Sequence, residues 1–153
     1  MRLSAADFAD KISEVMPSIM REFSRRQASE LMKGKVTLTQ MLILEFLERK
    51  GAVKMTDIAR FMQVSTAAAT GIVERLVKAG YVIRTFQEND RRIIRIKINS
   101  RGLDLVRRVA MERHKVLSSI FSSVSDKDRI DYLRILTKIN DNLIKEAVKS
   151  DEG

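Results

Sequence analysis

The spacing of apolar residues changes within one stretch of the chain, from Val36 to Gly102. Apolar residues first recur at helical spacing through three successive segments, and then they alternate with basic residues. Helical spacing predicts helices that bury one face, whereas strict alternation predicts a half-buried strand. We therefore expect three helices followed by a β-hairpin, and this order constrains the fold more than any other feature of the sequence.

The first two helices are predicted from their end signals. Thr37-Leu38-Thr39-Gln40 fits a capping box, so a helix should begin there and stop at Gly51. Its apolar positions are Met41, Ile43, Leu44 and Leu47. A second helix is expected from Thr56 to about Met62, with the apolar residues Ile58, Ala59 and Met62 on one side.

Ser65 is a suitable N-cap for a third helix that runs to Ala79, with Gly80 as its left-handed stop. Only Gln63 and Val64 separate this helix from the second one. Two helices joined by so short a turn must cross steeply, which predicts a helix-turn-helix.

The third helix has one side suited to packing and one open side. The packing residues are Ala69, Ile72, Val73 and Leu76, and the open residues are Ser65, Thr66, Ala67, Thr70, Gly71, Glu74, Arg75 and Lys78. Small residues in the open N-terminal half would let the helix enter a DNA major groove. They would equally allow close packing against another helix, so this helix alone leaves both interpretations open.

The basic composition of the hairpin favours a nucleic-acid partner. Tyr81–Phe86 and Ile93–Ile98 are predicted as strands around a polar loop, Gln87–Arg92. Its cations are Arg84, Arg91, Arg92, Arg95, Lys97 and Arg101. Asp90 is close enough in sequence to orient the guanidinium of Arg92 toward a minor groove. A charged hairpin is often only a solvated surface, but this one directly follows a candidate recognition helix. The predicted fold is mainly α with a small β-hairpin wing, a winged helix-turn-helix.

The chain resembles the multiple-antibiotic-resistance regulator (MarR) family of transcription factors. The resemblance rests on a spaced set of residues: Thr37, Gln40, Leu44, Leu47, Ile58, Ala59, Val64, Ser65, Thr70, Val73, Arg75, Leu76, Gly80, Arg84, Asp90-Arg91-Arg92, Ile96, Ile98, Asn99 and Gly102. It implies an obligate homodimer that binds double-stranded DNA. It also implies that Ser65, Thr66, Ala67, Thr70 and Arg75 face the major groove, and that Arg92 enters the minor groove braced by Asp90. Gly71 departs from the family, whose members often carry a larger and frequently basic side chain there.

Three amphipathic helices flank the winged part, and the resemblance implies that they form an intertwined dimerisation domain. One should begin after Ser4 and be kinked or restarted by Pro17, one should span Ser100–Val124, and one should follow the cap Ser125. Residues 1–34 and 101–153 are thus predicted to be the dimerisation region and 35–100 the DNA-binding domain. Their apolar stripes would be buried economically against a second copy in a two-fold bundle.

Composition narrows the function classes. The chain has 153 residues and a formal net charge of +9, which favours a polyanionic partner. It has no cysteine, which excludes disulfides, thiolate zinc sites and thiol-based sensing, and His114 is its single histidine. No catalytic constellation or cofactor motif is present, so a non-enzyme without metal is predicted. With no membrane-spanning apolar run or secretory core, a cytoplasmic protein is expected.

The eight methionines suggest either core filling or an adaptable effector pocket. Met16, Met20, Met41 and Met111 are the candidates for a pocket that binds a small aromatic or phenolic effector, as the resemblance implies. The leading hypothesis is a ligand-responsive repressor that binds a pseudo-palindromic operator. The alternatives are a ligand-independent architectural or anti-silencing DNA-binding protein and a winged helix used only for protein interaction.

Overall fold

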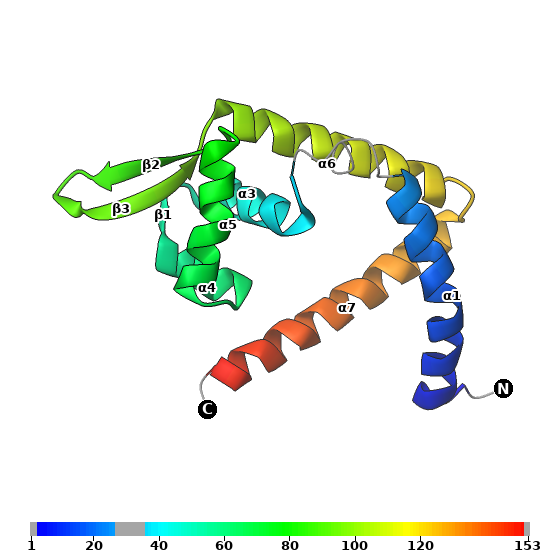
Figure 1. Ribbon diagram of the computed structural model, residues 1–153. Helices are drawn as coiled ribbons and strands as arrows, with labels where there is room; N and C mark the ends of the chain where they lie inside the picture. The colour runs from blue at the N-terminus through cyan, green and yellow to red at the C-terminus, as the bar shows by residue number, and fades with distance from the viewer. Residues whose placement is uncertain (1–2, 27–35, 152–153) are drawn as a thin grey trace. The chain divides into compact units, whose positions relative to one another are not determined.

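The structure is a computed structural model that describes residues 3–26 and 36–151 (Figure 1). Its elements are α1 (Ala5–Arg26), α3 (Leu38–Lys50), β1 (Val53–Lys54), α4 (Met55–Met62), α5 (Thr66–Lys78), β2 (Val82–Gln87), β3 (Asp90–Ile98), α6 (Ser100–Phe121) and α7 (Asp126–Asp151). The chain divides into two compact units, Met1–Arg113 and His114–Gly153. The mainly helical fold with a small antiparallel sheet confirms the predicted class.

The ends of α3 and α5 form as their cap residues predict. The Thr37 hydroxyl accepts from the Gln40 amide at 3.2 Å, and the Gln40 side chain accepts from the Thr37 amide at 2.8 Å. Ser65 accepts from the amide of Ala68 at 3.1 Å. At the other end of α5, Gly80 has φ of 75°, and the Tyr81 amide donates back to the carbonyl of Leu76 at 3.0 Å. This Schellman closure ends α5 and directs the chain into β2.

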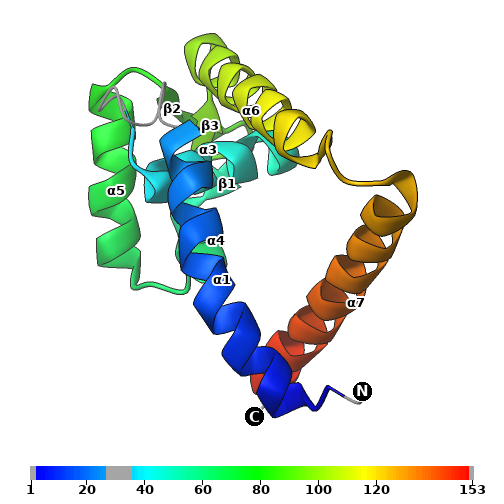
Figure 2. The same ribbon diagram turned by 90° about the vertical axis from the view of Figure 1, so that its right-hand side faces the viewer.

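The helix-turn-helix consists of α4 and α5. Helix α4 begins at Met55, one residue before the predicted start, and ends at Met62. Its C-cap, Gln63, has a left-handed conformation with φ of 53°. Both ribbon views show α4 meeting the N-terminal end of α5 (Figure 1, Figure 2).

The sheet has the strand order β1-β3-β2, and both pairings are antiparallel. The sequence did not predict β1, because a strand of two residues is too short to show a period. Strand β3 begins at Asp90, so the prediction of a loop through Arg92 was wrong in extent. Gln87 pairs with Asp90 across a turn formed by Glu88 and Asn89. Charged residues at the start of β3 have no apolar alternation, which explains why the sequence pattern hid this part of the strand.

One hydrophobic core, with residues from Val36 to Val109, holds together the part of the chain that we call the winged unit. It is formed by buried residues of α3, α4, α5, the sheet and the first half of α6. Its large side chains that are completely buried include Ile43, Leu44, Leu47, Ile58, Leu76, Ile96 and Leu105. The predicted packing side of α5 is confirmed, with Ala69, Val73 and Leu76 fully buried and Ile72 partly buried against the cluster. The recognition helix and the sheet therefore share one core.

Asn99 and Gly102 join the wing to α6 and to the end of α5. The Asn99 side chain donates to the carbonyl of Gly80 at 2.9 Å and accepts from the Gly102 amide at 2.9 Å. A Cβ at Gly102 would lie 2.4 Å from the carbonyl oxygen of Tyr81. Only glycine allows this close approach, so the base of the wing is fixed against α5.

The predicted caps of the flanking helices also form. Ser4 and Asp7 bond reciprocally at the start of α1, and Ser125 accepts from the Asp128 amide at the start of α7. Helix α1 continues through Pro17, so the expected restart does not occur. None of the helices in the described ranges combines the length and apolarity needed to cross a bilayer.

Candidate nucleic-acid interface

The N-terminal half of α5 presents an open, nearly uncharged surface. Ser65, Thr66 and Ala67 are exposed, and Thr70 is half-buried. Exposed helix N-termini attract phosphate through their free amides and the helix dipole. An added Cβ at the exposed Gly71 would meet nothing within 4 Å, so the backbone itself is accessible at this turn. This surface can approach a polyanion closely.

Thr70 lies at the edge of this surface. Its hydroxyl donates to the carbonyl of Thr66, one turn earlier, at 2.7 Å. The hydroxyl proton is thus used within the helix, and the oxygen keeps its capacity to accept a further hydrogen bond.

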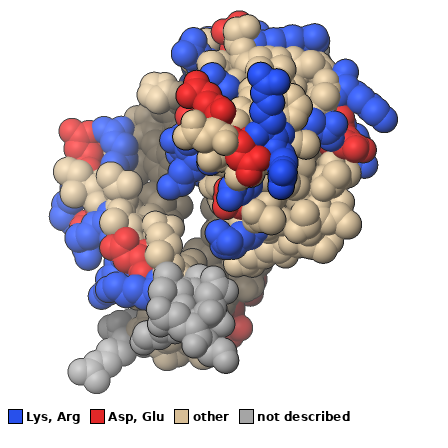
Figure 3. Space-filling view, turned by 90° about the vertical axis from the view of Figure 1, so that its left-hand side faces the viewer, with Lys and Arg blue, Asp and Glu red and all other residues tan. Residues whose placement is uncertain are grey.

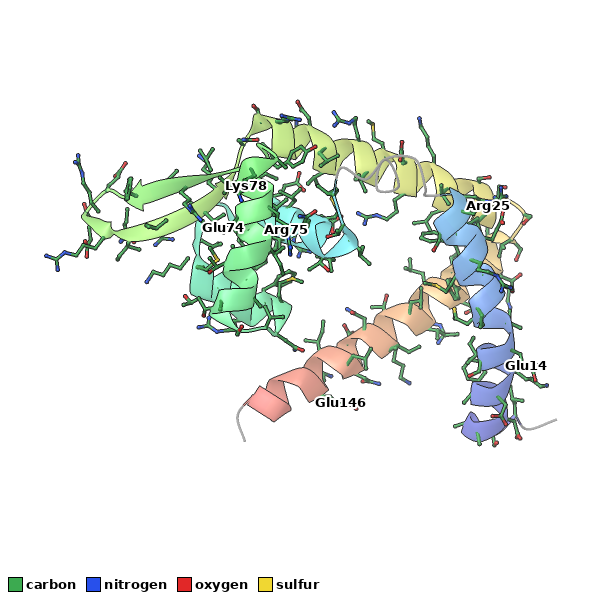
Figure 4. The ribbon with its side chains drawn as sticks, in the orientation of Figure 1. Glu14, Arg25, Glu74, Arg75, Lys78 and Glu146 are labelled. Atoms are coloured by element: carbon green, nitrogen blue, oxygen red, sulfur yellow. The ribbon has the colours of Figure 1, made fainter. Side chains whose placement is uncertain are left out.

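The charged residues in the second half of α5 point in different directions (Figure 4). Glu74 extends toward the wing, Arg75 extends from the other side of the helix, and Lys78 lies at the end next to α6. All three are exposed. Of these three, Arg75 and Lys78 are the predicted DNA contacts, and both are accessible to a partner.

The two faces of the wing differ. Directly paired residues of β2 and β3 share a face, and the face of Val82, Ile96 and Ile98 is buried in the core. Arg84 pairs with Ile96 and lies on this inner face. Its Nη2 is 3.5 Å from Oε1 of Glu74, an exposed ion pair that links the wing to α5. Arg84 is therefore placed beside the recognition helix.

Arg95 and Lys97 lie on the opposite, outer face, because they pair with Thr85 and Ile83. The Arg95 guanidinium bonds to Gln87 and to the carbonyl of Ala52. The sequence predicted Arg95 as a DNA contact. Three N–H groups of its guanidinium are bonded within the protein, and the contact with DNA stays a prediction.

Asp90, Arg91 and Arg92 lie at the exposed tip of the wing. Oδ1 of Asp90 accepts from the backbone amide of Arg92 at 3.0 Å. The expected brace on the Arg92 guanidinium is thus a backbone contact in the single chain, and the described residues show no ion pair between the two side chains. Asp90 shapes the turn that carries Arg92. Figure 3 shows Lys and Arg side chains across this face of the winged unit, with a few acidic ones among them.

Sequence reasoning missed one apolar feature of the wing. Phe86 and Ile94 form a directly paired couple on the inner face, and they are 63% and 49% exposed. They continue the alternation of the core face beyond the point where the core ends. This continued alternation is visible in the sequence, and it could have predicted that Phe86 and Ile94 share the inner face of the wing.

The four methionines proposed for an effector pocket differ in burial. Met41 is 2% exposed within the core, which confirms core filling at that position. Met16, Met20 and Met111 are 38%, 53% and 58% exposed. A pocket formed by these three would need a further surface to close it, so the effector site stays a prediction.

Within residues 3–26 and 36–151, no group of three or more histidine or acidic side chains is arranged to bind a metal ion. His114 is exposed there.

The crossed helices α4 and α5, the paired strands and the shared core define a winged helix-turn-helix protein. The model of the MarR family matches residues 36–94. The uncharacterized HTH-type transcriptional regulator YfiV of Bacillus subtilis is 31% identical over 121 residues, which are 77% of this chain and 76% of YfiV. The chain belongs to the MarR family of transcription regulators.

Two further comparisons cover more of the chain. The HTH-type transcriptional repressor MdtR of Bacillus subtilis is 23% identical over 149 residues, which are 97% of this chain and 93% of MdtR. A mutant of MepR from S. aureus, solved bound to an oligodeoxyribonucleotide, has the same fold with a TM-score of 0.65 at 20% identity. That match covers 86% of this chain and 96% of MepR.

Proposed function

We propose that this chain is a homodimeric repressor that binds a pseudo-palindromic operator. The observation that carries the proposal is the position of Arg84, which joins the inner face of the wing to α5 through Glu74. The recognition helix and the wing share one hydrophobic core, and this exposed contact lies between them, which supports their acting on DNA together. A helix of this kind suits a major groove, and a cationic wing tip suits the adjacent minor groove.

A homodimer is supported by apolar residues that the single chain leaves exposed. In α1 these are Phe8, Ile12, Val15 and Ile19, and in α7 they are Ile130, Leu133, Leu136, Ile139, Leu143 and Ile144. Contiguous exposed apolar surface marks an interaction site. A two-fold dimer would carry two recognition helices, which is why the operator should be pseudo-palindromic.

Repression is supported by the similarity to MdtR, which is named a repressor. Response to a small aromatic or phenolic effector is the further part of the proposal, and Met16, Met20 and Met111 are its candidate contacts. A DNA partner implies that the protein works in the cytoplasm. A ligand-independent architectural role would share the same DNA surface and would differ only in the absence of an effector response.

The test is to map the protected sequence on the DNA upstream of the protein's own gene and to titrate that duplex at several salt concentrations. A specific complex should protect two half-sites, and its log affinity should fall steeply with log salt, with a slope of about −0.9 per phosphate neutralised. Binding that is weak, insensitive to salt and equal on unrelated DNA would contradict the proposal. Release of the operator by small aromatic acids would separate a ligand-responsive repressor from an architectural protein.

A further inference from the structure

Arg95 contacts two other segments of the winged unit. Its Nη1 donates to the carbonyl of Ala52 at 3.0 Å, and its Nη2 and Nε donate to Oε1 of Gln87 at 3.0 and 3.3 Å. Ala52 precedes β1, Gln87 ends β2, and Arg95 lies within β3. One half-buried guanidinium therefore ties together three segments of the chain.

The position of Arg95 in the sheet gives these bonds a particular role. Arg95 pairs with Thr85 on one side and with Lys54 on the other, whereas the next pair toward the tip, Ile94 with Phe86, has β2 and β3 alone. The sheet thus changes from three strands to two at Arg95. A two-stranded hairpin is only marginally stable by itself. The orientation of the wing tip therefore depends on the contacts made at Arg95, where the third strand ends.

The register of the hairpin also changes just beyond Arg95. Phe86 pairs with Ile94, but the next residue, Gln87, pairs with Asp90. Residues 91–93 bulge out of the ladder between these pairs, and they include both cations of the tip. The bonds from Arg95 to Gln87 cross the bulge, so they restrain the part of the strand that carries Arg91 and Arg92.

We propose that Arg95 is a positioning residue for DNA recognition. Through Gln87 and Ala52 it fixes the angle at which the wing leaves the core, so that Arg91 and Arg92 meet the groove, and it does not itself bind phosphate. Its location on the outer face of the sheet, opposite the face of Arg84, agrees with this role. The inference rests on the proposed DNA-binding function.

The first experiment measures the wing without DNA. Because the chain has no cysteine, Asn89→Cys in the turn gives a single site for a spin label. Gln87→Met removes the acceptor and should increase the mobility of the label, whereas Gln87→Glu keeps an acceptor and should leave it as restrained as in the parent. Lys97→Met removes the neighbouring cation of the outer face and should leave the mobility of the label unchanged. A label equally restrained in Gln87→Met and in the parent overturns the proposal.

The second experiment measures operator affinity without the label. Gln87→Met and Arg95→Met should each weaken binding, Arg95→Met by about five-fold. The double variant should be no weaker than Arg95→Met alone, because Arg95→Met already removes the contacts with both Gln87 and Ala52. The slope of log affinity against log salt should stay at the parent value. If Arg95→Met reduces the slope by about one while Gln87→Met binds like the parent, Arg95 is a phosphate contact and the proposal is wrong.

The two experiments distinguish a failure of the proposed DNA-binding function from a failure of the positioning role of Arg95. If the parent binds no DNA, the proposed function fails, yet the spin label still decides whether Arg95 and Gln87 restrain the tip. If the parent binds its operator but the two variants lose affinity additively, DNA recognition stands and the positioning role falls.

Discussion

At the scale of single residues, Gly71 and Gly102 show that two helical glycines can have opposite roles. An added Cβ at Gly71 would be free of contacts, whereas at Gly102 it would also lie 2.6 Å from Cγ1 of Ile98. We expect Gly71→Ala to raise the free energy of unfolding by up to about 1 kcal/mol. Gly102→Ala should lower it by on the order of 2 kcal/mol, because the backbone must shift. Urea unfolding of both variants measures the difference.

The same Gly71→Ala variant also reports on the DNA surface. If the backbone at this turn meets a base edge, the added methyl group should weaken operator binding even though it stabilises the fold. A variant that is both more stable and unchanged in affinity would place Gly71 away from the groove.

Thr70→Val is the corresponding test of a side chain. The substitution keeps the shape of Thr70 and removes a hydroxyl whose oxygen is free to accept, since its proton already serves Thr66. We expect operator affinity to fall by about 1 kcal/mol, the usual net size of one hydrogen bond, with little change in stability. A change in melting temperature without a change in affinity would show that Thr70 serves only the fold.

Arg92 and Asp90 should contribute unequally to binding. Arg92→Ala should weaken operator affinity by about 1 to 3 kcal/mol and relax the preference for A·T at the flanks, because it removes a minor-groove contact. Asp90→Ala should cause a smaller loss of operator affinity, although it removes a negative charge. The reason is that the Arg92 amide loses the acceptor that shapes the turn carrying Arg92.

Asp90→Asn is the matched control for this pair, because it keeps the acceptor and removes the charge. It should bind DNA at least as well as the parent. If Asp90→Ala tightens binding to the same degree as Asp90→Asn, the backbone contact is unimportant and the wing acts only through its net charge.

At the scale of elements, the end of α1 has a pH dependence of definite sign. Hydrogen bonds from Arg25 and then from Arg26 lower the pKa of Glu22 to about 2. Because the pKa is lower in the folded chain, this stabilisation is present above the ordinary value of 4.5 and is lost as the pH falls through about 2. NMR titration of the Glu22 carboxyl should show the low midpoint, and replacing both arginines with glutamine should raise it.

Elements also show what the sequence could and could not predict. Thr37, Ser65 and Ser125 act within a few residues along the chain, so their caps could be read locally. Strand β1 and the bulge depend on pairing between distant segments. The same reason explains Arg95, which looks like any wing cation in the sequence and differs only because Ala52 and Gln87 lie within reach of it.

At the scale of the whole molecule, the apolar residues of α1 and α7 have to be explained. The structure places no side chain of α1 in a core, and residues such as Leu143 of α7 are 60% exposed. Helices with one apolar face gain most of their stability from packing that face. A second copy supplies the same surfaces, so a dimer accounts for them without any other partner.

We therefore expect a homodimer at micromolar concentration, with most of its interface from Met1 to about Phe23 and from Leu103 to Ala147. Leu143→Lys places a charge in the proposed interface and should shift sedimentation toward the monomer, because an unpaired charge is costly to bury. Asn142→Lys adds the same charge at the adjacent exposed position and should remain dimeric. Leu143→Lys should also lose two-fold protection of the operator, because a monomer carries one recognition helix. A well-folded parent monomer at this concentration would contradict the dimer and, with it, the expected symmetry of the operator.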